Sequence, residues 1–262
     1  MDISLDGRNA LITGGSAGLG LAMARRFASS GAGVVIVARR AEVLEAAAEM
    51  IRREARVPER VHAVPADVRV VEQINEAHRE AVGLLGSIDI LVNNAGTSAT
   101  SAFGDISDEA WQADFDLKLF AAIRVMRLVL PDMRSQRWGR IINVLNTAAK
   151  APAAGSAPTA VTRAAGMALT KAVASEVAAD NVLVNALCTG LLVSEQWERR
   201  YASGADGSSF EEYVAKVGHR VPLGRMGEAD EFARLACFLA SDAASYVTGT
   251  AINIDGGLCP VV

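Results

Sequence analysis

Short apolar runs alternate with longer segments of helical periodicity along the whole chain, and this alternation limits the folds that it can adopt. The predicted strands are residues 10–13, 34–38, 61–64, 88–92, 140–145, 183–187 and 251–254. The predicted helices lie between them, at 18–30, 41–55, 70–85, 107–134, 158–179 and 228–240. Most of the strands are apolar on both faces, as parallel strands covered by helices are. Right-handed strand–helix–strand units then predict an α/β fold, a doubly wound seven-stranded parallel sheet with helices on both faces.

A single domain, residues 1–262, is expected because no linker, repeat or low-complexity tract divides the chain. Residues 194–221 are the exception to the alternation, since Gly204, Gly207, Ser208 and Ser209 lie between the helical pieces 196–201 and 210–218. A long insertion after a late strand is typical of a lid over a site at the carboxyl ends of the strands. The alternative is an ordinary surface excursion.

Composition excludes several classes of function. A net charge of −4 and a pI near 5.5 argue against nucleic-acid binding. Cys188, Cys237 and Cys259 are too few and too scattered for a disulfide framework or a metal site. The amino terminus lacks the apolar core of a signal peptide, and the apolar runs are too short to span a membrane. We therefore expect a cytoplasmic protein with reduced thiols, no metal, and no nucleic-acid or membrane partner.

A glycine-rich segment, TGGSAGLG at residues 13–20, follows the first strand and opens the first helix. Glycines there let the backbone approach a pyrophosphate, and the helix amino terminus supplies amides and a favourable dipole. The segment predicts a Rossmann-type dinucleotide site. Its candidate cofactor-binding residues are Gly14, Ser16, Ala17, Gly18, Leu19 and Gly20.

The end of the second strand distinguishes between the two nicotinamide dinucleotides. An acidic residue there would accept the ribose hydroxyls of NAD, but the chain has Ala38, Arg39 and Arg40. A guanidinium can hold a 2′-phosphate, and no carboxylate is present to repel it, so NADP(H) is the predicted cofactor. The alternative is that both arginines belong only to an exposed helix start.

Further motifs in the same order resemble the short-chain dehydrogenase/reductase family, and within it the classical branch that includes the 3-oxoacyl-carrier-protein reductases. The resemblance covers essentially the whole chain. It rests on the glycine-rich loop, the NNAG element at 93–96, Asn185 and Gly190 of a modified N-x-x-x-P-G element, and the carboxyl-terminal PLGR and DGG segments. The resemblance implies further cofactor contacts at Asp67, Val68, Asn94, Ala95, Gly96, Arg163, Gly190, Leu192 and Ser194.

The catalytic positions of this family are all substituted. Its members use a Ser, a Tyr, a Lys and an Asn, and the register of the neighbouring motifs puts Asn146, Thr159, Arg163 and Lys118 at those positions. No tyrosine lies between Met1 and Arg200, so a small shift of register does not restore a phenol. The sequence therefore predicts an intact cofactor site beside an altered proton-transfer site.

Each substitution leaves alternatives. The hydroxyl of Thr159 is a poor general acid and shorter than tyrosine, so it contacts substrate or, as we favour, fills space. Asn146 can donate its amide to a developing oxyanion. Lys118 acts as an acid or base if burial lowers its pKa, or else forms an ion pair with Asp114 or Asp116. Permanently protonated, Arg163 either anchors an anion or forms a structural ion pair.

Three functions remain open at this point. The first is an atypical NADP(H)-dependent oxidoreductase acting on a carbonyl or alcohol. The second is a non-redox lyase or isomerase on the same scaffold, and the third is a non-catalytic NADP(H)-binding protein. We expect a small-molecule substrate with an acidic group, met by Lys118, Lys150 or Arg163. The resemblance also implies a homodimer or homotetramer, with helices 107–134 and 158–179 at the interface.

Overall fold

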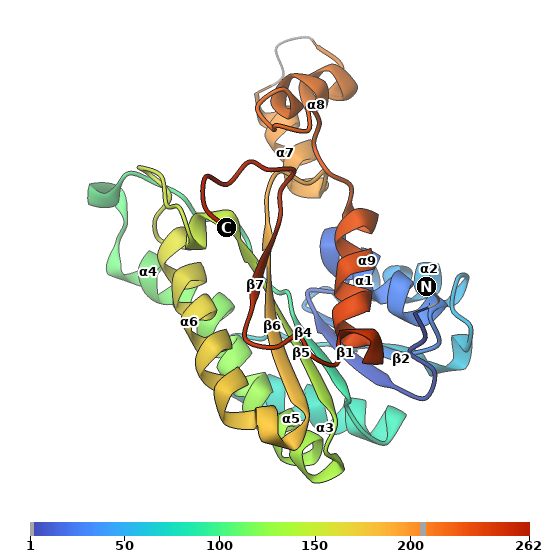
Figure 1. The fold of residues 1–262 in the computed structure, drawn as a ribbon. Helices are drawn as coiled ribbons and strands as arrows, with labels where there is room; N and C mark the ends of the chain where they lie inside the picture. The colour runs from blue at the N-terminus through green and yellow to red at the C-terminus, as the bar shows by residue number, and fades with distance from the viewer. Residues whose placement is uncertain (1–2, 205–207) are drawn as a thin grey trace.

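The computed structural model describes residues 3–204 and 208–262 and contains one seven-stranded, all-parallel sheet (Figure 1). The strand order is β3-β2-β1-β4-β5-β6-β7. The strands are β1 Asn9–Thr13, β2 Gly33–Ala38, β3 Val61–Pro65, β4 Ile90–Asn93, β5 Gly139–Asn146, β6 Val182–Thr189 and β7 Ala251–Ile254. The predicted doubly wound Rossmann-type fold is thereby confirmed.

Helices cover both faces of the sheet because its side chains alternate between two apolar layers. Ala10 and Ile12 of β1 pack into one core and Leu11 into the other, as the period of two in a strand requires. The first core is closed by α1 Gly18–Ser29, α2 Ala41–Arg52 and α9 Ala229–Ala240. The second is closed by α3 Val71–Leu85, α5 Ala121–Gln136 and α6 Thr159–Val177, on the opposite side of the sheet in Figure 1.

One predicted helix, 107–134, is divided in the structure. It consists of α4 Asp108–Phe115, a π-helical turn at Asp116–Phe120, and α5. A π turn accommodates an extra residue in a helix and is frequent at functional sites. Here the wide turn contains Lys118, which is buried against neighbouring elements. Hydrophobic periodicity continues through the turn, so the sequence pattern did not indicate the break.

The order of the strands reverses between β1 and β4, and the loops after the parallel strands meet at one edge of the sheet. The loops that follow β1, β4 and β6, the end of β5 and the start of α6 contribute residues to a common cavity there. Ligands of doubly wound sheets bind in the crevice at such a reversal. The topology therefore places the candidate site at this edge.

Helices α7 Glu195–Ser203 and α8 Phe210–Gly218 occupy the predicted lid segment and stand beyond the carboxyl ends of the strands (Figure 1). Aromatic side chains join them: the ring of Tyr201 lies 5.6 Å from that of Phe210 and 5.6 Å from that of Tyr213. Residues 205–207 of the predicted lid, and residues 1 and 2 of the predicted single domain, lie outside the described residues. Movement of this segment over the site stays a prediction.

Within the described residues, no helix has the length and apolar character needed to cross a bilayer. The same residues contain no group of three His, Cys, Asp or Glu side chains placed to hold a metal ion.

Candidate functional site

The glycine-rich loop has the backbone geometry that phosphate binding requires. Gly14 and Gly18 adopt positive φ angles of 67° and 54°, a region that favours glycine. A Cβ at Gly14 would lie 2.9 Å from Nδ2 of Asn94, so this position has no room for a side chain. No side chain caps the amino terminus of α1 at Ala17. The first amides of α1 are therefore available to an anion.

The NNAG element fixes the loop after β4 to the phosphate loop. Oγ1 of Thr13 accepts hydrogen bonds from the backbone N–H groups of Asn94 (3.0 Å) and Ala95 (3.1 Å). The side-chain amide of Asn94 in turn donates to the carbonyl oxygens of Thr13 and Gly14, both at 3.0 Å. Two loops that are far apart in the sequence are thus held together as one wall of the site.

This wall borders a cavity of about 370 Å³, which we call the inner cavity. Several predicted cofactor-binding residues line it together: Gly14, Ser16, Ala17, Gly18, Leu19, Arg40, Asn94, Gly96, Arg163 and Ser194. Two further predicted residues, Asn146 and Thr159, line the same cavity. The glycine-rich loop and three of the four residues predicted to occupy the catalytic positions of the family therefore share one space.

A side cavity of about 120 Å³ at the end of β2 is lined by four more of the predicted cofactor-binding residues, Arg39, Asp67, Val68 and Ala95. The carboxylate of Asp67 accepts hydrogen bonds from Nε of Arg69 at 3.0 and 3.1 Å. These bonds hold the pKa of Asp67 below its ordinary value. The one carboxylate of this cavity is therefore engaged with a guanidinium, while Arg39 is exposed at the strand end.

Three residues predicted to bind cofactor line neither of these cavities. Gly20 packs against the phosphate loop, since a Cβ there would lie 2.1 Å from the carbonyl oxygen of Gly14. Gly190 packs against Asp255, whose Cα would be 2.5 Å from an added Cβ. Leu192 is buried and forms a β-bridge with Gly227. All three shape the walls of the site through packing.

Lys118 does not line the inner cavity and belongs to a buried polar cluster with Asp114, Thr159 and Thr162. Its Nζ forms an ion pair with Asp114, and both side chains are almost fully buried. The second oxygen of Asp114 accepts from Oγ1 of Thr162 at 2.6 Å. Burial lowers the pKa of Lys118 to about 8; the hydrogen bond that Lys118 donates to Asp114 opposes this shift, and the nearby charge of Arg163 reinforces it. The ion-pair alternative for Lys118 is the arrangement that the structure contains.

The hydroxyl of Thr159 is fully used within the protein. It accepts hydrogen bonds from Nζ of Lys118 (2.8 Å) and from the backbone N–H of Ala99 (2.9 Å), and it donates to the carbonyl oxygen of Ala99 (2.8 Å). A threonine hydroxyl has one donor and two acceptor sites, so none is left for a substrate. Thr159 therefore ties the start of α6 to the loop after β4 and to the π turn.

Arg163 and Asn146 differ from Thr159 because each has hydrogen-bonding capacity to spare. Nη1 of Arg163 donates to the carbonyl oxygen of Val144 at 2.6 Å. Within the described part of the chain, however, Nε of Arg163 and Oδ1 of Asn146 are buried without a partner. Burial lowers the pKa of Arg163 to about 10, which leaves it a cation at neutral pH. Buried polar atoms without partners are rare in folded proteins, so a ligand of the inner cavity is expected to satisfy these two.

A dinucleotide fits this arrangement. The first residues of α1 line the cavity that phosphates would enter, and Arg163, which lines the same cavity, has a donor at Nε without a partner among the described residues. Arg39 and Arg40 border the side cavity and the inner cavity respectively. The residues present therefore match the group that the sequence predicted.

Sequence reasoning missed a second, outer cavity of about 660 Å³, between residues 96–100 and helix α7. Its basic residues are Arg199 and Arg200. Of the three basic residues expected to meet the substrate, only Arg163 lines the inner cavity, because Lys118 is buried and Nζ of Lys150 donates to the carbonyl oxygen of Ala251 at 2.6 Å. The sequence feature that could have indicated the outer cavity is the pair Arg199 and Arg200 in the first helical piece of the predicted lid.

Comparisons with known proteins agree with this geometry. A family model described as enoyl-(acyl carrier protein) reductase matches residues 14–259. The 3-oxoacyl-acyl-carrier-protein reductase FabG of Aquifex aeolicus is 34% identical over 258 residues, which cover 98% of this chain and 100% of that protein. L-sorbose reductase from Gluconobacter frateurii, solved with NADPH and L-sorbose, superposes with a TM-score of 0.95 at 34% identity over the whole of both chains.

A third relative is a short-chain oxidoreductase from Pseudomonas aeruginosa PAO1, described as containing an atypical catalytic center. Its NADPH-bound structure superposes with a TM-score of 0.92 at 35% identity and covers 99% of each chain. The matched family model, the relatives and the solved structures agree in indicating one family. The chain belongs to the short-chain dehydrogenase/reductase family.

Proposed function

We propose that this protein is an NADP(H)-dependent oxidoreductase that interconverts a carbonyl and an alcohol without the Ser, Tyr, Lys and Asn residues usual in its family. The proposal is carried by one observation: Asn146 and Arg163 line the cavity that the phosphate loop borders, and each has a buried polar atom without a partner among the described residues. When bound, NADPH supplies a hydride. The protein's part is to hold the cofactor, orient the carbonyl and stabilise the charge that develops on its oxygen.

The side-chain amide of Asn146 orients the substrate oxygen in this proposal. Asn146 ends β5 and lines the inner cavity; its Nδ2 donates to the carbonyl oxygen in this proposal, and its Oδ1 can accept from the hydroxyl of the alcohol. The guanidinium of Arg163 adds a fixed positive charge beside that oxygen. Water supplies the proton, because the hydroxyl of Thr159 is fully bonded and Lys118 lies behind it. Without a positioned acid, turnover is expected to be about 10²–10⁴-fold slower than with one.

Asn146→Ala is expected to lower kcat/KM for NADPH-dependent carbonyl reduction by about 10²-fold, the scale of losing one oxyanion donor. The dissociation constant for NADPH should change little, because the phosphate loop is untouched. Stopped-flow absorbance at the nicotinamide band gives the first quantity and calorimetry the second. Thr147→Ala is the matched control, since this neighbouring side chain does not line the cavity. Equal rates in both variants would remove Asn146 from the chemistry.

Arg39 and Arg40 are proposed to hold the 2′-phosphate of NADP(H). The double variant Arg39→Gln/Arg40→Gln is expected to weaken NADPH binding by about 10-fold or more, while NADH binding stays nearly constant, because charge-assisted bonds to phosphate are strong. Titration of both dinucleotides by calorimetry measures the change in preference. Arg53→Gln, an exposed arginine at the far end of α2, is the control. Parallel losses for NADPH and NADH would contradict the assignment.

A second candidate is a non-catalytic NADP(H)-binding protein, and the bonding of Thr159 favours it. A catalytic hydroxyl needs a donor directed at the substrate, whereas Oγ1 of Thr159 donates to Ala99. The two candidates differ in a direct measurement. NADPH consumption with any member of a panel of ketones, diketones and sugars supports the oxidoreductase, and binding without consumption supports the second candidate.

We also propose a homodimer or homotetramer built on α4, α5 and α6. Phe120, at the end of the π turn that precedes α5, and Val161 of α6 are 39% and 46% exposed in the single chain, as large apolar side chains at an interface between copies would be.

A further inference from the structure

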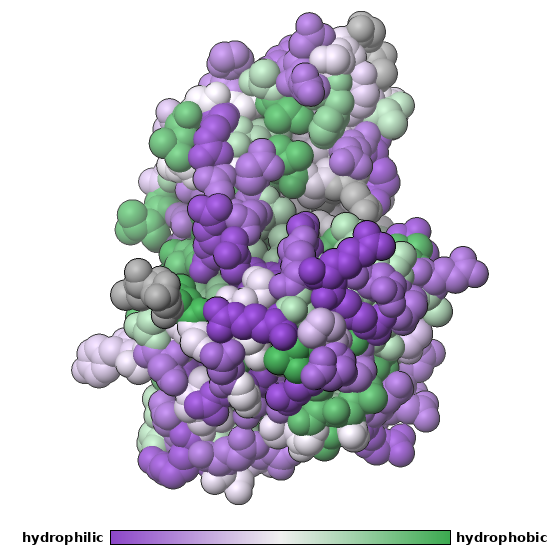
Figure 2. Space-filling view, turned by 90° about the vertical axis from the view of Figure 1, so that its right-hand side faces the viewer, coloured by the Kyte–Doolittle hydropathy of each residue, from purple (hydrophilic) through white to green (hydrophobic). Residues whose placement is uncertain are grey.

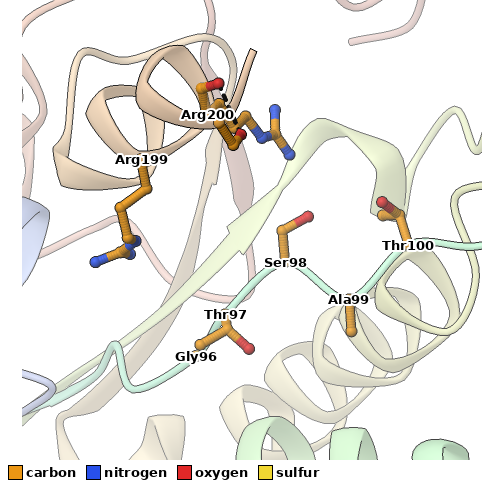
Figure 3. Close-up of a pocket in the computed structure, with 8 residues that line it drawn as sticks. Gly96, Thr97, Ser98, Ala99, Thr100, Arg199 and Arg200 are labelled. Carbon is orange, nitrogen blue, oxygen red and sulfur yellow. Dashed lines mark hydrogen bonds between the residues drawn. The ribbon is translucent and has the colours of Figure 1, made fainter.

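The outer cavity has a lining suited to an anion. Residues 96–100 form one side, and Arg199, Arg200 and Ser203 of α7 form the other. Of the described residues that line it, the two arginines carry the only charges, and Thr97, Ser98, Thr100 and Ser203 add hydroxyl groups. Figure 3 shows the two arginine side chains leaving α7 in different directions, with Ser98 on the opposite side below Arg200 and with Arg199 directed away from Ser98. Guanidinium and hydroxyl donors together form the set that binds carboxylates and phosphates.

The outer cavity continues into the inner one. Gly96, Thr97, Ser98 and Arg199 line both cavities, whereas Arg200 lines the outer cavity alone. Asn146 lines the inner cavity alone. A molecule that spans the two spaces therefore places one end beside Asn146 and the other between α7 and the 96–100 loop.

The guanidinium of Arg200 is held in place by its own helix. Its central carbon lies 4.8 Å from the ring centroid of Trp197, one turn earlier in α7. The ring of Trp197 in turn lies 6.3 Å from that of Tyr213 in α8. An arginine that is stacked before its ligand arrives loses less conformational entropy on binding. Figure 2 shows that hydrophilic side chains dominate the face of the molecule below the raised α7–α8 segment in that view.

We propose that Arg199 and Arg200 bind a carboxylate or phosphate group of the substrate, and so make this protein selective for anionic carbonyl compounds. This inference rests on the proposed function for the carbonyl end at Asn146. Arg200 is the anchor for the acidic group. Arg199, which lines both cavities, contributes charge where the two spaces join.

The test measures binding and needs no turnover. Wild-type protein saturated with NADP⁺, which cannot reduce a carbonyl, is titrated calorimetrically with 4-oxopentanoate and with its ethyl ester. The same titration is made with dihydroxyacetone phosphate and with dihydroxyacetone. At least one anionic compound is expected to bind about 10-fold or more tightly than its neutral counterpart. The compound that gains distinguishes a carboxylate from a phosphate.

Arg200→Gln and Arg199→Gln are expected to abolish this preference for the anion. Arg220→Gln, which removes the same charge from the end of α8 outside both cavities, should retain it. Equal binding of charged and neutral compounds to the wild type, or a preference that survives in both arginine variants, would overturn the proposal. A large loss of NADP⁺ binding in Arg200→Gln would also overturn it, by assigning the arginine to the cofactor.

The outcome is separable from that of the proposed function. Arginine-dependent binding of an anion without any NADPH consumption supports the anion site and rejects the oxidoreductase. NADPH consumption with neutral and anionic carbonyls at equal efficiency supports the oxidoreductase and rejects the anion site.

Discussion

Lys118→Met is expected to lower the free energy of unfolding by about 3–5 kcal/mol, the usual cost of removing one partner from a buried ion pair. The side chain of Asp114 is only 3% exposed and would remain in the interior with its hydrogen bond from Thr162 but without its cation. The hydroxyl of Thr159 would lose a donor in the same step. Denaturant unfolding at neutral pH, followed by circular dichroism, measures the loss.

A double variant measures how strongly Lys118 and Asp114 are coupled in their contribution to the free energy of unfolding. Lys118→Met/Asp114→Leu should recover most of the stability lost in Lys118→Met, because an apolar pair in the same volume leaves no buried charge. Arg234→Met is the control, since Arg234 and Asp230 form an exposed pair with the same i,i+4 spacing and 68% and 49% exposure. That variant should lose at most about 1 kcal/mol. If the losses of Lys118→Met and Asp114→Leu simply add, the two residues are not coupled as the structure indicates.

The fold was predictable because its signals are local. Apolar runs of strand length, interrupted by helical periodicity, set the boundaries of the sheet to within a few residues. The glycine-rich loop was equally predictable, because a glycine is required where the backbone approaches a neighbouring loop as closely as it does at Gly14. Motif order and spacing also predicted that Asn146, Thr159 and Arg163 lie at one site, and all three line the same cavity.

The contacts of individual side chains were not predictable in the same way. The bonding of Thr159 depends on Ala99 and Lys118, which are distant in the sequence and meet only when α6, the π turn and the loop after β4 pack together. The π turn itself disturbs no hydrophobic pattern. For the same reason the role of Lys118 stayed open between alternatives at the level of the sequence, and only packing placed it beside Asp114.

The outer cavity shows a further limit. From the sequence alone, Arg199 and Arg200 are interpreted as part of the polar face of an ordinary surface helix. Helix periodicity predicts which residues share a face but not which element that face contacts. The position of α7 opposite residues 96–100 follows from the connection after β6 and from its packing on α8. Gly190 and Leu192, which the resemblance marks as cofactor contacts, have contacts that the sequence did not indicate, with Asp255 and Gly227 respectively.

The central claim is that a working cofactor site remains beside a replaced proton-transfer site. Restoring the usual family residues should therefore create or strongly increase carbonyl reduction. The changes are Lys118→Asn, Asn146→Ser, Thr159→Tyr and Arg163→Lys. Asp114→Ile accompanies them, because Asp114 would otherwise be buried without its cation. A tyrosine at position 159 starts from the first turn of α6, beside the inner cavity, and provides a phenol with an ordinary pKa of about 10.

The matched control carries the same changes with Thr159→Phe in place of Thr159→Tyr, which keeps the ring and omits the acid. Circular dichroism and NADPH titration first establish that both variants fold and bind the cofactor. This step separates a failure of folding from a failure of chemistry.

The deciding measurement is kcat/KM for NADPH-dependent reduction of diacetyl and simple ketones by the tyrosine variant, the phenylalanine control and the wild type. The account predicts that the tyrosine variant exceeds both of the others by about 10²-fold or more, the contribution of a positioned general acid. A folded, NADPH-binding tyrosine variant that is no faster than its phenylalanine control would contradict the account, because the four positions would then not surround the reacting atoms.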